Sequence, residues 1–437
     1  MNLSHGHDKP YYITAARSTK CTGATRPRSH GDEMPADYVI ESNGTAIVHA
    51  GGRAPPGTAA ATCVVCKGRR FCGQQQCPIL SSLSVTFRNR PSFSHETVTR
   101  ALDIHLGTAG FPQEPAGVVL GEQGLGGSAT RDEAFARLRT SSYATAGSRG
   151  AGSLALNDLA LSDRPVSVRI TWETGPADTA AFSAASAPRM HPGTYARIEI
   201  EGPVHVPAAV KPLLGREESP EPVIAEGRAA GLDPDYLSRL HALGMFGAPP
   251  WQIPTRWAQA TVYDICSRAA LHHIKGWDVL GEPALYVADA LGDPFFILLL
   301  SRPWEFELIE TWAPNTVWTL GERDAITVHE HETYRGASDL ALREGGSYFS
   351  TRLGITELLE REHRQAAALV VRASQPGAST PLGSSAIYRA VAGARRIGTY
   401  ATEDEALEAL ASAAGLGVRS LGATSMILQQ GRLTAWF

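Results

Sequence analysis

Four cysteines crowd into fifteen residues near the N-terminal end of the sequence. They are Cys63, Cys66, Cys72 and Cys77, spaced C-x2-C-x5-C-x4-C. Four thiolates with this spacing can surround one tetrahedral ion, because a C-x2-C turn brings two sulfurs to one side of the metal and nearby glycines permit tight reversals. The spacing therefore predicts one structural zinc ion with no open coordination position. An iron–sulfur cluster is the alternative that uses the same ligands.

Three cations lie between these cysteines, namely Lys67, Arg69 and Arg70. A rigid loop that holds three cations can grip the phosphates of a nucleic acid. Alternatively, the metal only stabilises a loop that lacks a core of its own, and the cations keep that loop soluble. The sequence leaves both interpretations open.

Two further segments place guanidinium groups beside aromatic rings and carboxylates. Arg256 precedes Trp257 at an expected helix start, and residues 361–365 read REHRQ. This combination suits contact with phosphates or bases. The plainer interpretation is an exposed helix with paired charges. We retain Arg256 as a candidate nucleic-acid contact.

The last eight residues, QGRLTAWF, follow the pattern Q-x-x-h-x-x-a-a. In a short helical turn Leu433, Trp436 and Phe437 fall on one side as three apolar prongs, one turn after Gln430. Burial of one large aromatic side chain contributes roughly 1.5–3 kcal/mol, so three prongs can sustain micromolar binding. The pattern is typical of the peptide that DNA replication and repair proteins use to bind the sliding clamp, PCNA. The alternative is that Trp436 and Phe437 pack against their own domain as a terminal strand.

Other polar runs offer weaker candidates for catalysis. His329 and His331 alternate, so on a strand both face one way and can form a metal pair, although such a run is more often a solvated edge. Glu305, Glu307 and Glu310 can supply acids for metal-dependent phosphodiester cleavage. None of these spacings is diagnostic of a nuclease.

The elements that must position these residues divide the chain into four parts. Residues 1–60 lack any sustained period and are predicted to be a disordered leader. Residues 61–200 form an N-terminal domain with the four-cysteine metal module and a mixed β-rich region, and residues 205–415 form a C-terminal domain. Residues 416–437 are predicted to be a flexible tail that carries the clamp-binding peptide.

Secondary-structure signals are strongest in the C-terminal domain. Asp233-Pro234 predicts the start of a helix, Thr255 opens a second one, and Thr402 and Gly415 bound a third. The apolar runs at 284–291, 295–301 and 306–312 predict an antiparallel meander, followed by a helix at 347–364 and a strand at 367–372. Shorter strands are expected at 83–87, 118–120 and 166–172. The fold class is therefore α+β.

Composition limits the partners of the protein. The chain has 40 Lys and Arg against 44 Asp and Glu, a formal net charge of −4, so no global basic field predicts binding to nucleic acid or to an anionic membrane. No run of eighteen apolar residues and no signal peptide is present. We expect a cytoplasmic, nucleoid-associated protein with no membrane contact.

From Cys63 to Phe437 the sequence resembles the Nre family of archaeal DNA-repair proteins. The landmarks are the C-x2-C-K-G…C-G-x3-C-P segment, the C-terminal clamp-binding peptide, and the segments at 254–257, 304–310 and 345–349. The resemblance implies participation in DNA-damage repair and recruitment to PCNA through the tail, with DNA as a further partner. It does not define a reaction, so an enzyme that acts on nucleic acid or nucleotides, recruited by the same tail, is the alternative. Trp436 departs from the Phe or Tyr that is usual in clamp-binding peptides.

Overall fold

The structure is a computed structural model of the chain. It describes residues 39–42, 45–49, 63–64, 77, 79, 83–87, 95–107, 116–121, 142–146, 153–175, 180–181, 189–190, 193–247, 252–290, 292–316, 318–319, 321–336, 346–374 and 383–434.

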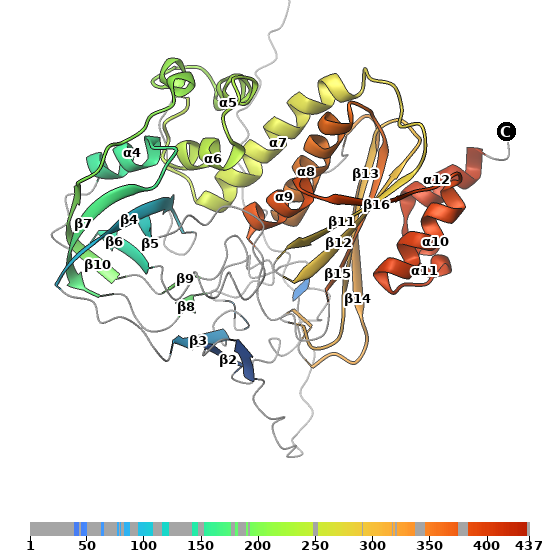
Figure 1. Cartoon of the computed structure of the whole chain (residues 1–437), viewed down its shortest axis with the longest axis horizontal. Coiled ribbons are helices and arrows are strands. Elements are labelled where there is room, and N and C mark those ends of the chain that lie inside the picture. Colours follow the sequence, from blue (N-terminus) through green and yellow to red (C-terminus); the bar gives the residue numbers. More distant parts are fainter. Residues whose placement is uncertain are drawn as a thin grey trace, which may run out of the picture.

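Five strands of the N-terminal half close into a barrel in the order β10-β6-β5-β4-β7 (Figure 1). They are β4 (Glu96–His105), β5 (Gly117–Gly121), β6 (Ser142–Ala146), β7 (Val166–Thr174) and β10 (Gly193–Ile200). Strand β7 shows the predicted alternation, with Val166, Val168 and Ile170 buried and the residues between them half-buried. The strands predicted at 118–120 and 166–172 are therefore confirmed as β5 and β7.

Two smaller sheets accompany the barrel. Strands β1 (Val39–Ser42), β2 (Thr45–His49) and β3 (Leu83–Phe87) pair in that order, and β8 (Ala180–Ala181) pairs with β9 (Arg189–Met190). Strand β3 is the one predicted at 83–87. Strands β1 and β2 fall inside residues 1–60, where we predicted a disordered leader. They form there because β2 pairs with β3, which lies later in the chain, and β1 pairs with β2.

Helices lie on one side of the barrel and lead to the C-terminal half (Figure 1). They are α4 (Ser153–Leu161), the 3-10 helix η1 (Ala208–Leu213), α5 (Pro220–Ala229), α6 (Pro234–Ala242) and α7 (Thr255–Ile274). Helix α6 starts as predicted, because the Asp233 carboxylate accepts a hydrogen bond from the Asp235 backbone N–H at 2.9 Å. At the predicted start of α7, the Thr255 hydroxyl instead accepts from the Leu106 N–H at 2.9 Å, which ties the helix to the end of β4.

The C-terminal half is built on a six-stranded sheet in the order β14-β13-β15-β12-β11-β16. The strands are β11 (Ala284–Ala290), β12 (Asp293–Leu300), β13 (Glu305–Trp312), β14 (Ile326–Glu332), β15 (Ala367–Ser374) and β16 (Arg395–Thr399). The predicted three-strand meander is wrong in one respect: β11 and β12 pair antiparallel, but β15 lies between β12 and β13 and runs parallel to β13. All eight residues of β15 are buried, and such a strand is most stable in the centre of a sheet.

Helices cover both faces of this sheet (Figure 1). Helices α7, α8 (Gly346–Glu362) and α9 (Ser384–Ala392) lie on one face, and α10 (Glu403–Ala414), α11 (Val418–Thr424) and α12 (Met426–Thr434) lie on the other. Alternation along β15 supplies both cores, since Ala368 and Val370 join the first and Leu369 and Val371 the second. The predicted α+β class is confirmed.

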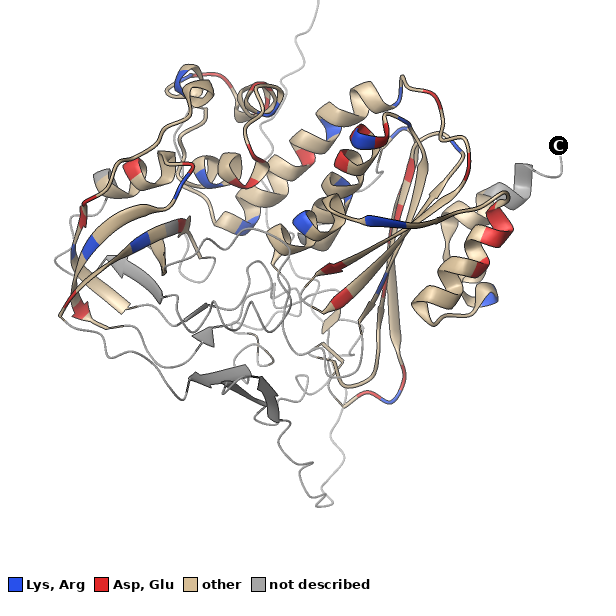
Figure 2. Cartoon of the chain, viewed as in Figure 1, with Lys and Arg blue, Asp and Glu red and all other residues tan. Residues whose placement is uncertain are grey.

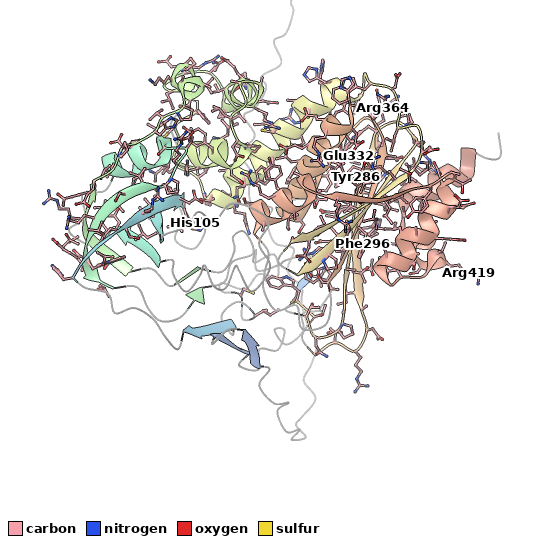
Figure 3. The ribbon with its side chains drawn as sticks, viewed as in Figure 1. His105, Tyr286, Phe296, Glu332, Arg364 and Arg419 are labelled. Atoms are coloured by element: carbon pink, nitrogen blue, oxygen red, sulfur yellow. The ribbon has the colours of Figure 1, made fainter. Side chains whose placement is uncertain are left out.

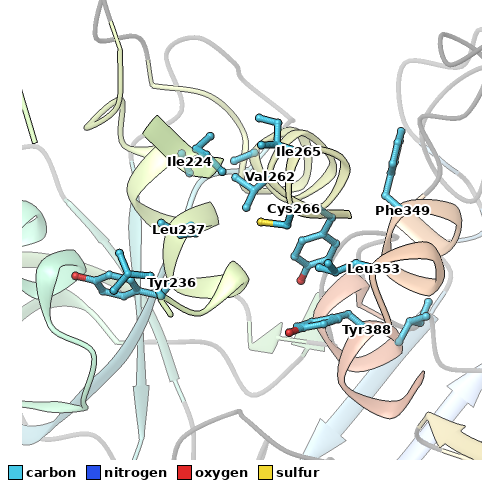
Figure 4. Packing of buried hydrophobic residues seen from close by; sticks show 14 of the residues in the cluster. Ile224, Tyr236, Leu237, Val262, Ile265, Cys266, Phe349, Leu353 and Tyr388 are labelled. Carbon is cyan, nitrogen blue, oxygen red and sulfur yellow. The ribbon is translucent and has the colours of Figure 1, made fainter. Parts of the chain in front are cut away.

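One hydrophobic cluster runs from the barrel through α5, α6 and α7 to the first face of the sheet. Figure 4 shows its middle, where Leu237 of α6, Cys266 of α7 and Leu353 of α8 pack together. Burial raises the pKa of the Cys266 thiol to about 12. The boundary that we predicted between residues 200 and 205 therefore does not separate two hydrophobic cores.

The predicted flexible tail from residue 416 differs from the structure over most of its length. Helices α11 and α12 occupy 418–434, and Leu421, Ile427 and Leu428 are buried against the second face of the sheet. The segment looks low in complexity, but its few large apolar side chains suffice to dock it. Among the described residues, no helix is long and apolar enough to cross a membrane.

Candidate functional site

A buried carboxylate lies at the end of β14, where several of the family landmarks meet. Glu332 is buried, and it accepts hydrogen bonds from the Trp304 indole N–H at 3.1 Å and from the Tyr348 hydroxyl at 2.5 Å. Arg352 of α8 completes the site with an ion pair at 2.9 Å. Trp304 belongs to the segment 304–310 and Tyr348 to the segment 345–349, so the fold brings together two segments that the sequence only places in order.

Arg352 links this carboxylate to helix α7. Its guanidinium group donates to the Asp264 carboxylate at 2.9 Å and to the Ser267 hydroxyl at 2.7 Å. Both Arg352 and Glu332 are almost fully buried, and removing one partner of such a pair costs about 3–5 kcal/mol. The network therefore fixes β14, α7 and α8 in one arrangement.

Gln365 connects the same network to the loop that follows α7. Its side-chain oxygen accepts from the Trp304 backbone N–H at 3.3 Å, and its amide donates to the backbone carbonyls of Trp277 at 2.6 Å and Lys275 at 3.3 Å. The two loop residues are thus held against the start of β13. In the sequence Gln365 is only the last residue of REHRQ, and nothing there indicates these contacts.

Aromatic rings and cations form a surface next to the hydrogen-bond network of Glu332 and Gln365. We call it the aromatic–cation surface; its members are Lys275, Trp277, Tyr334, Arg335, His363 and Arg364. The Lys275 ammonium lies 4.8 Å from the centre of the Tyr334 ring and donates to the Tyr334 carbonyl at 2.5 Å. The Trp277 and His363 rings lie 4.3 Å apart. Figure 3 labels Arg364 and Glu332 near the same end of the six-stranded sheet.

The electrostatics of this surface are mixed. Burial lowers the pKa of the Lys275 ammonium, while the nearby Glu332 carboxylate opposes that effect. Figure 2 shows acidic as well as basic residues at the ends of α7 and α8. Among the acids, Glu362 is engaged by the Arg396 guanidinium and by the Tyr286 hydroxyl. The aromatic–cation surface is therefore a local site rather than part of a basic field.

A groove of about 440 Å³ opens beside the aromatic–cation surface. Its lining residues are Arg302, Pro303, Trp304, Glu305, Thr333, Tyr334, Arg335 and Gln430. Tyr334 leaves 47% of its surface exposed, which makes it one of few large apolar side chains exposed in the described part of the chain. Gln430 comes from α12, so the groove lies between the end of the sheet and the last helix.

Helix α12 is held by a second buried carboxylate. Glu307 of β13 is fully buried and accepts hydrogen bonds from the Ser425 hydroxyl at 2.6 Å, the Met426 N–H at 2.9 Å and the Ile427 N–H at 3.2 Å. These are donors at the start of α12, where the helix dipole favours a negative charge. Arg302 adds a hydrogen bond to the Ile427 carbonyl at 3.2 Å. The helix that carries Gln430 is thereby anchored to the centre of the sheet.

The other acids considered for catalysis are separated by the sheet. Glu305 and Glu307 point to the face with α12, whereas Glu310 points to the opposite face and pairs with the buried Arg372 at 2.8 Å. The structure therefore does not bring the three glutamates together.

The two histidines considered as a metal pair contact carboxylates. His331 lies 2.8 Å from Glu305, and His329 lies 3.4 Å from Glu307. Within the described residues, no group of three or more His, Cys, Asp or Glu side chains has the arrangement of a metal site. The solvated-edge interpretation suits His329, which is 43% exposed, but not His331, which is 14% exposed.

The predicted metal and clamp-binding residues are described only in part. Cys63 is buried and Cys77 is half-buried. Gln430 is exposed on α12, and the backbone of Leu433 continues that helix. Seven predicted residues lie outside the described part of the chain: Cys66, Lys67, Arg69, Arg70, Cys72, Trp436 and Phe437.

Arg256 is placed away from the aromatic–cation surface. It is half-buried in the first turn of α7, whereas Lys275 follows the last turn of the same helix. Twenty residues of helix separate the two ends by about 30 Å. The sequence analysis did not identify Lys275, Tyr334 or Arg352. The available signal was an aromatic residue and an arginine before a glycine, shortly after the alternating His329 and His331.

Models of one protein family match most of the chain. The model described as "Archaeal Nre, N-terminal" matches residues 71–319, and the model described as "Archaeal Nre, C-terminal" matches residues 332–435. No solved structure matches the chain significantly.

Three curated relatives carry the name DNA repair protein. The chain is 27% identical over 226 residues to DNA repair protein NreB of Archaeoglobus fulgidus, covering 51% of the chain and 56% of the relative. It is 30% identical over 217 residues to NreA of Haloferax volcanii, covering 48% and 52%. A match to NreA of Archaeoglobus fulgidus is 23% identical and covers 74% and 85%. The matched region thus spans about half the length of the first two relatives.

Proposed function

The chain belongs to the archaeal Nre family, and from this premise we propose that it takes part in DNA repair. The relatives with which it aligns are named as DNA repair proteins. In this proposal the protein works in the cytoplasm in association with the nucleoid, and DNA is one of its partners.

The proposed route to DNA is the sliding clamp, PCNA, bound through Gln430, Leu433, Trp436 and Phe437. The observation that supports it is the anchoring of α12 by the buried Glu307 carboxylate, with Gln430 exposed in the middle of the helix. An anchored helix holds Gln430 at a fixed place on the body, so less ordering is needed when a partner binds.

Calorimetric titration of the full chain into the sliding clamp of the same organism tests this route. We expect micromolar or tighter binding by the natural sequence and loss of measurable binding by the Phe437→Ala variant. The Gln429→Ala variant is the matched control, because Gln429 is exposed one residue before the motif. Absence of binding by the natural sequence would contradict recruitment through this peptide.

The four cysteines are proposed to hold one structural zinc ion. Four thiolates are a donor set that zinc prefers, and the burial of Cys63 supports an internal position for at least one of them. The loop with Lys67, Arg69 and Arg70 is then a candidate DNA contact. Metal analysis of the purified chain should give one zinc per chain, and this content should fall in the Cys66→Ser variant; iron with sulfide would indicate the cluster instead.

The alternative of an enzyme that cleaves phosphodiester bonds is not favoured by any arrangement among the described residues. The glutamates that could supply the acids are divided between the two faces of the sheet and are engaged by His331, α12 and Arg372. The recruitment proposal therefore stands without a catalytic step.

A further inference from the structure

The aromatic–cation surface has features that a helix-packing surface does not need. Tyr334 leaves about half of its surface exposed, although burying an aromatic ring is favourable, and the Lys275 ammonium lies 4.8 Å from the centre of its ring. The tight turn from Thr333 to Gly336, closed by a hydrogen bond from the Gly336 N–H to the Thr333 carbonyl at 2.9 Å, keeps the ring in place. The ring is therefore presented to solvent on a rigid support.

The cations around this ring are available for a ligand. Lys275, Arg335 and Arg364 form no ion pair with a carboxylate in the described part of the chain; Lys275 and Arg364 contact only backbone carbonyls and rings. By contrast, Arg372 of β15 is bound to the Asp293 carboxylate and Arg302, just after β12, to the Glu403 carboxylate. Unpaired cations beside an exposed ring suit a ligand that carries both negative charge and flat apolar faces.

A second ring pair extends the surface. The Trp277 and His363 rings lie 4.3 Å apart with their planes tilted by 35°, and the Trp277 carbonyl accepts a hydrogen bond from the Gln365 amide at 2.6 Å. His363 has a φ of +50°, a left-handed conformation that non-glycine residues rarely adopt and that places its ring over Trp277. Two ring systems, one on the Thr333–Gly336 turn and one held by Gln365, can each receive one flat group.

We propose that the aromatic–cation surface and the adjoining groove bind single-stranded DNA, with bases stacked on Tyr334 and on the Trp277–His363 pair and phosphates held by Arg335, Arg364 and Lys275. Stacking platforms with flanking cations are the general solution for single strands, because every base has a flat face and every phosphate a charge. The open groove of about 440 Å³ is lined by Tyr334 and Arg335 and gives a strand room to continue from the ring. This inference rests on the proposed role in DNA repair and specifies the form of DNA that is bound.

Fluorescence anisotropy with a labelled oligothymidylate, at low salt and with the full chain, tests the inference. Tyr334→Ala should weaken binding about tenfold, whereas Tyr334→Phe, which keeps the ring, should bind like the natural sequence. The double variant Arg335→Ala, Arg364→Ala should weaken binding and flatten its dependence on salt. Arg419→Ala is the matched control, because Arg419 is exposed on α11 and lies away from Arg364 (Figure 3).

Three results would overturn the inference. These are no binding of the oligonucleotide by the natural sequence, equal binding by Tyr334→Ala and Tyr334→Phe, or a duplex of the same length that binds as tightly with the same sensitivity to the variants. Unchanged thermal unfolding of the variants shows that they are folded. Clamp binding depends on Phe437 and is measured separately, so failure here and failure of the recruitment proposal are distinguishable.

Discussion

Replacing Glu307 with glutamine should release helix α12 from the sheet. The carboxylate receives three hydrogen bonds from the start of α12, and each bond to a charged acceptor contributes about 1.5–3 kcal/mol. Glutamine keeps the shape and one acceptor oxygen but loses the charge and its interaction with the helix dipole. We expect α12 to lose about 2 kcal/mol of local stability, which corresponds to an opening equilibrium that is about 30-fold larger.

Hydrogen exchange followed by mass spectrometry measures this change directly. Amides of residues 426–430 should exchange about 30-fold faster in Glu307→Gln, while those of the distant helix α5 should keep their rates. Glu305→Gln is the matched control, because Glu305 lies on the same face of β13 but pairs with His331 instead of α12. Exchange of 426–430 within about threefold of the natural rate would refute the assignment of Glu307 as the anchor.

Two further predictions follow from buried positions. Burial lowers the pKa of His241 from its ordinary value of 6.5 to about 4. Between these two pH values the imidazole takes up a proton in the unfolded chain but not in the folded chain. The free energy of unfolding should therefore fall by about 2 kcal/mol from pH 7 to pH 5, and by less in His241→Gln. Unfolding in urea at the two pH values measures this, and equal slopes in both proteins would contradict it. At Gly354 an added Cβ would lie 2.7 Å from the Val391 side chain, so Gly354→Ala should cost about 1–3 kcal/mol. Val391→Ala should restore part of this loss in a double-mutant cycle, and additive effects would show that the clash is not the cause.

Local signals allowed much of the fold to be predicted from the sequence. Asp233 and Thr402 start their helices by accepting hydrogen bonds from backbone N–H groups two or three residues ahead, at Asp235 and Glu405. Gly415 ends α10 with a φ of +66°, a conformation that glycine adopts without strain. Each of these features depends on neighbours within one turn, so the residue types are sufficient evidence.

Pairings between residues far apart in the sequence could not be predicted from these local signals. Strand β15 joins β12 and β13 from a position more than fifty residues later in the chain, and nothing in the three runs before it shows that their order will be interrupted. Lys275 and Tyr334 meet across 59 residues, and Glu307 and Ile427 across 120. The docking of the tail was missed for this reason, because its anchor is a carboxylate on a strand far from it in the sequence.

The buried ion pairs beneath the aromatic–cation surface matter for position more than for stability. A buried pair such as Glu332 and Arg352 recovers little beyond the cost of removing both charges from water, and apolar side chains of the same volume would stabilise a core as well. An apolar core would not, however, fix the direction in which its side chains point. The hydrogen bonds to Glu332 do so, because they define the rotamers of Glu332 and Trp304. Tyr334 follows Glu332 by two residues, so only Thr333 separates the exposed ring from the side chain that the network fixes. The network therefore fixes the end of β14, from which the Tyr334 turn continues.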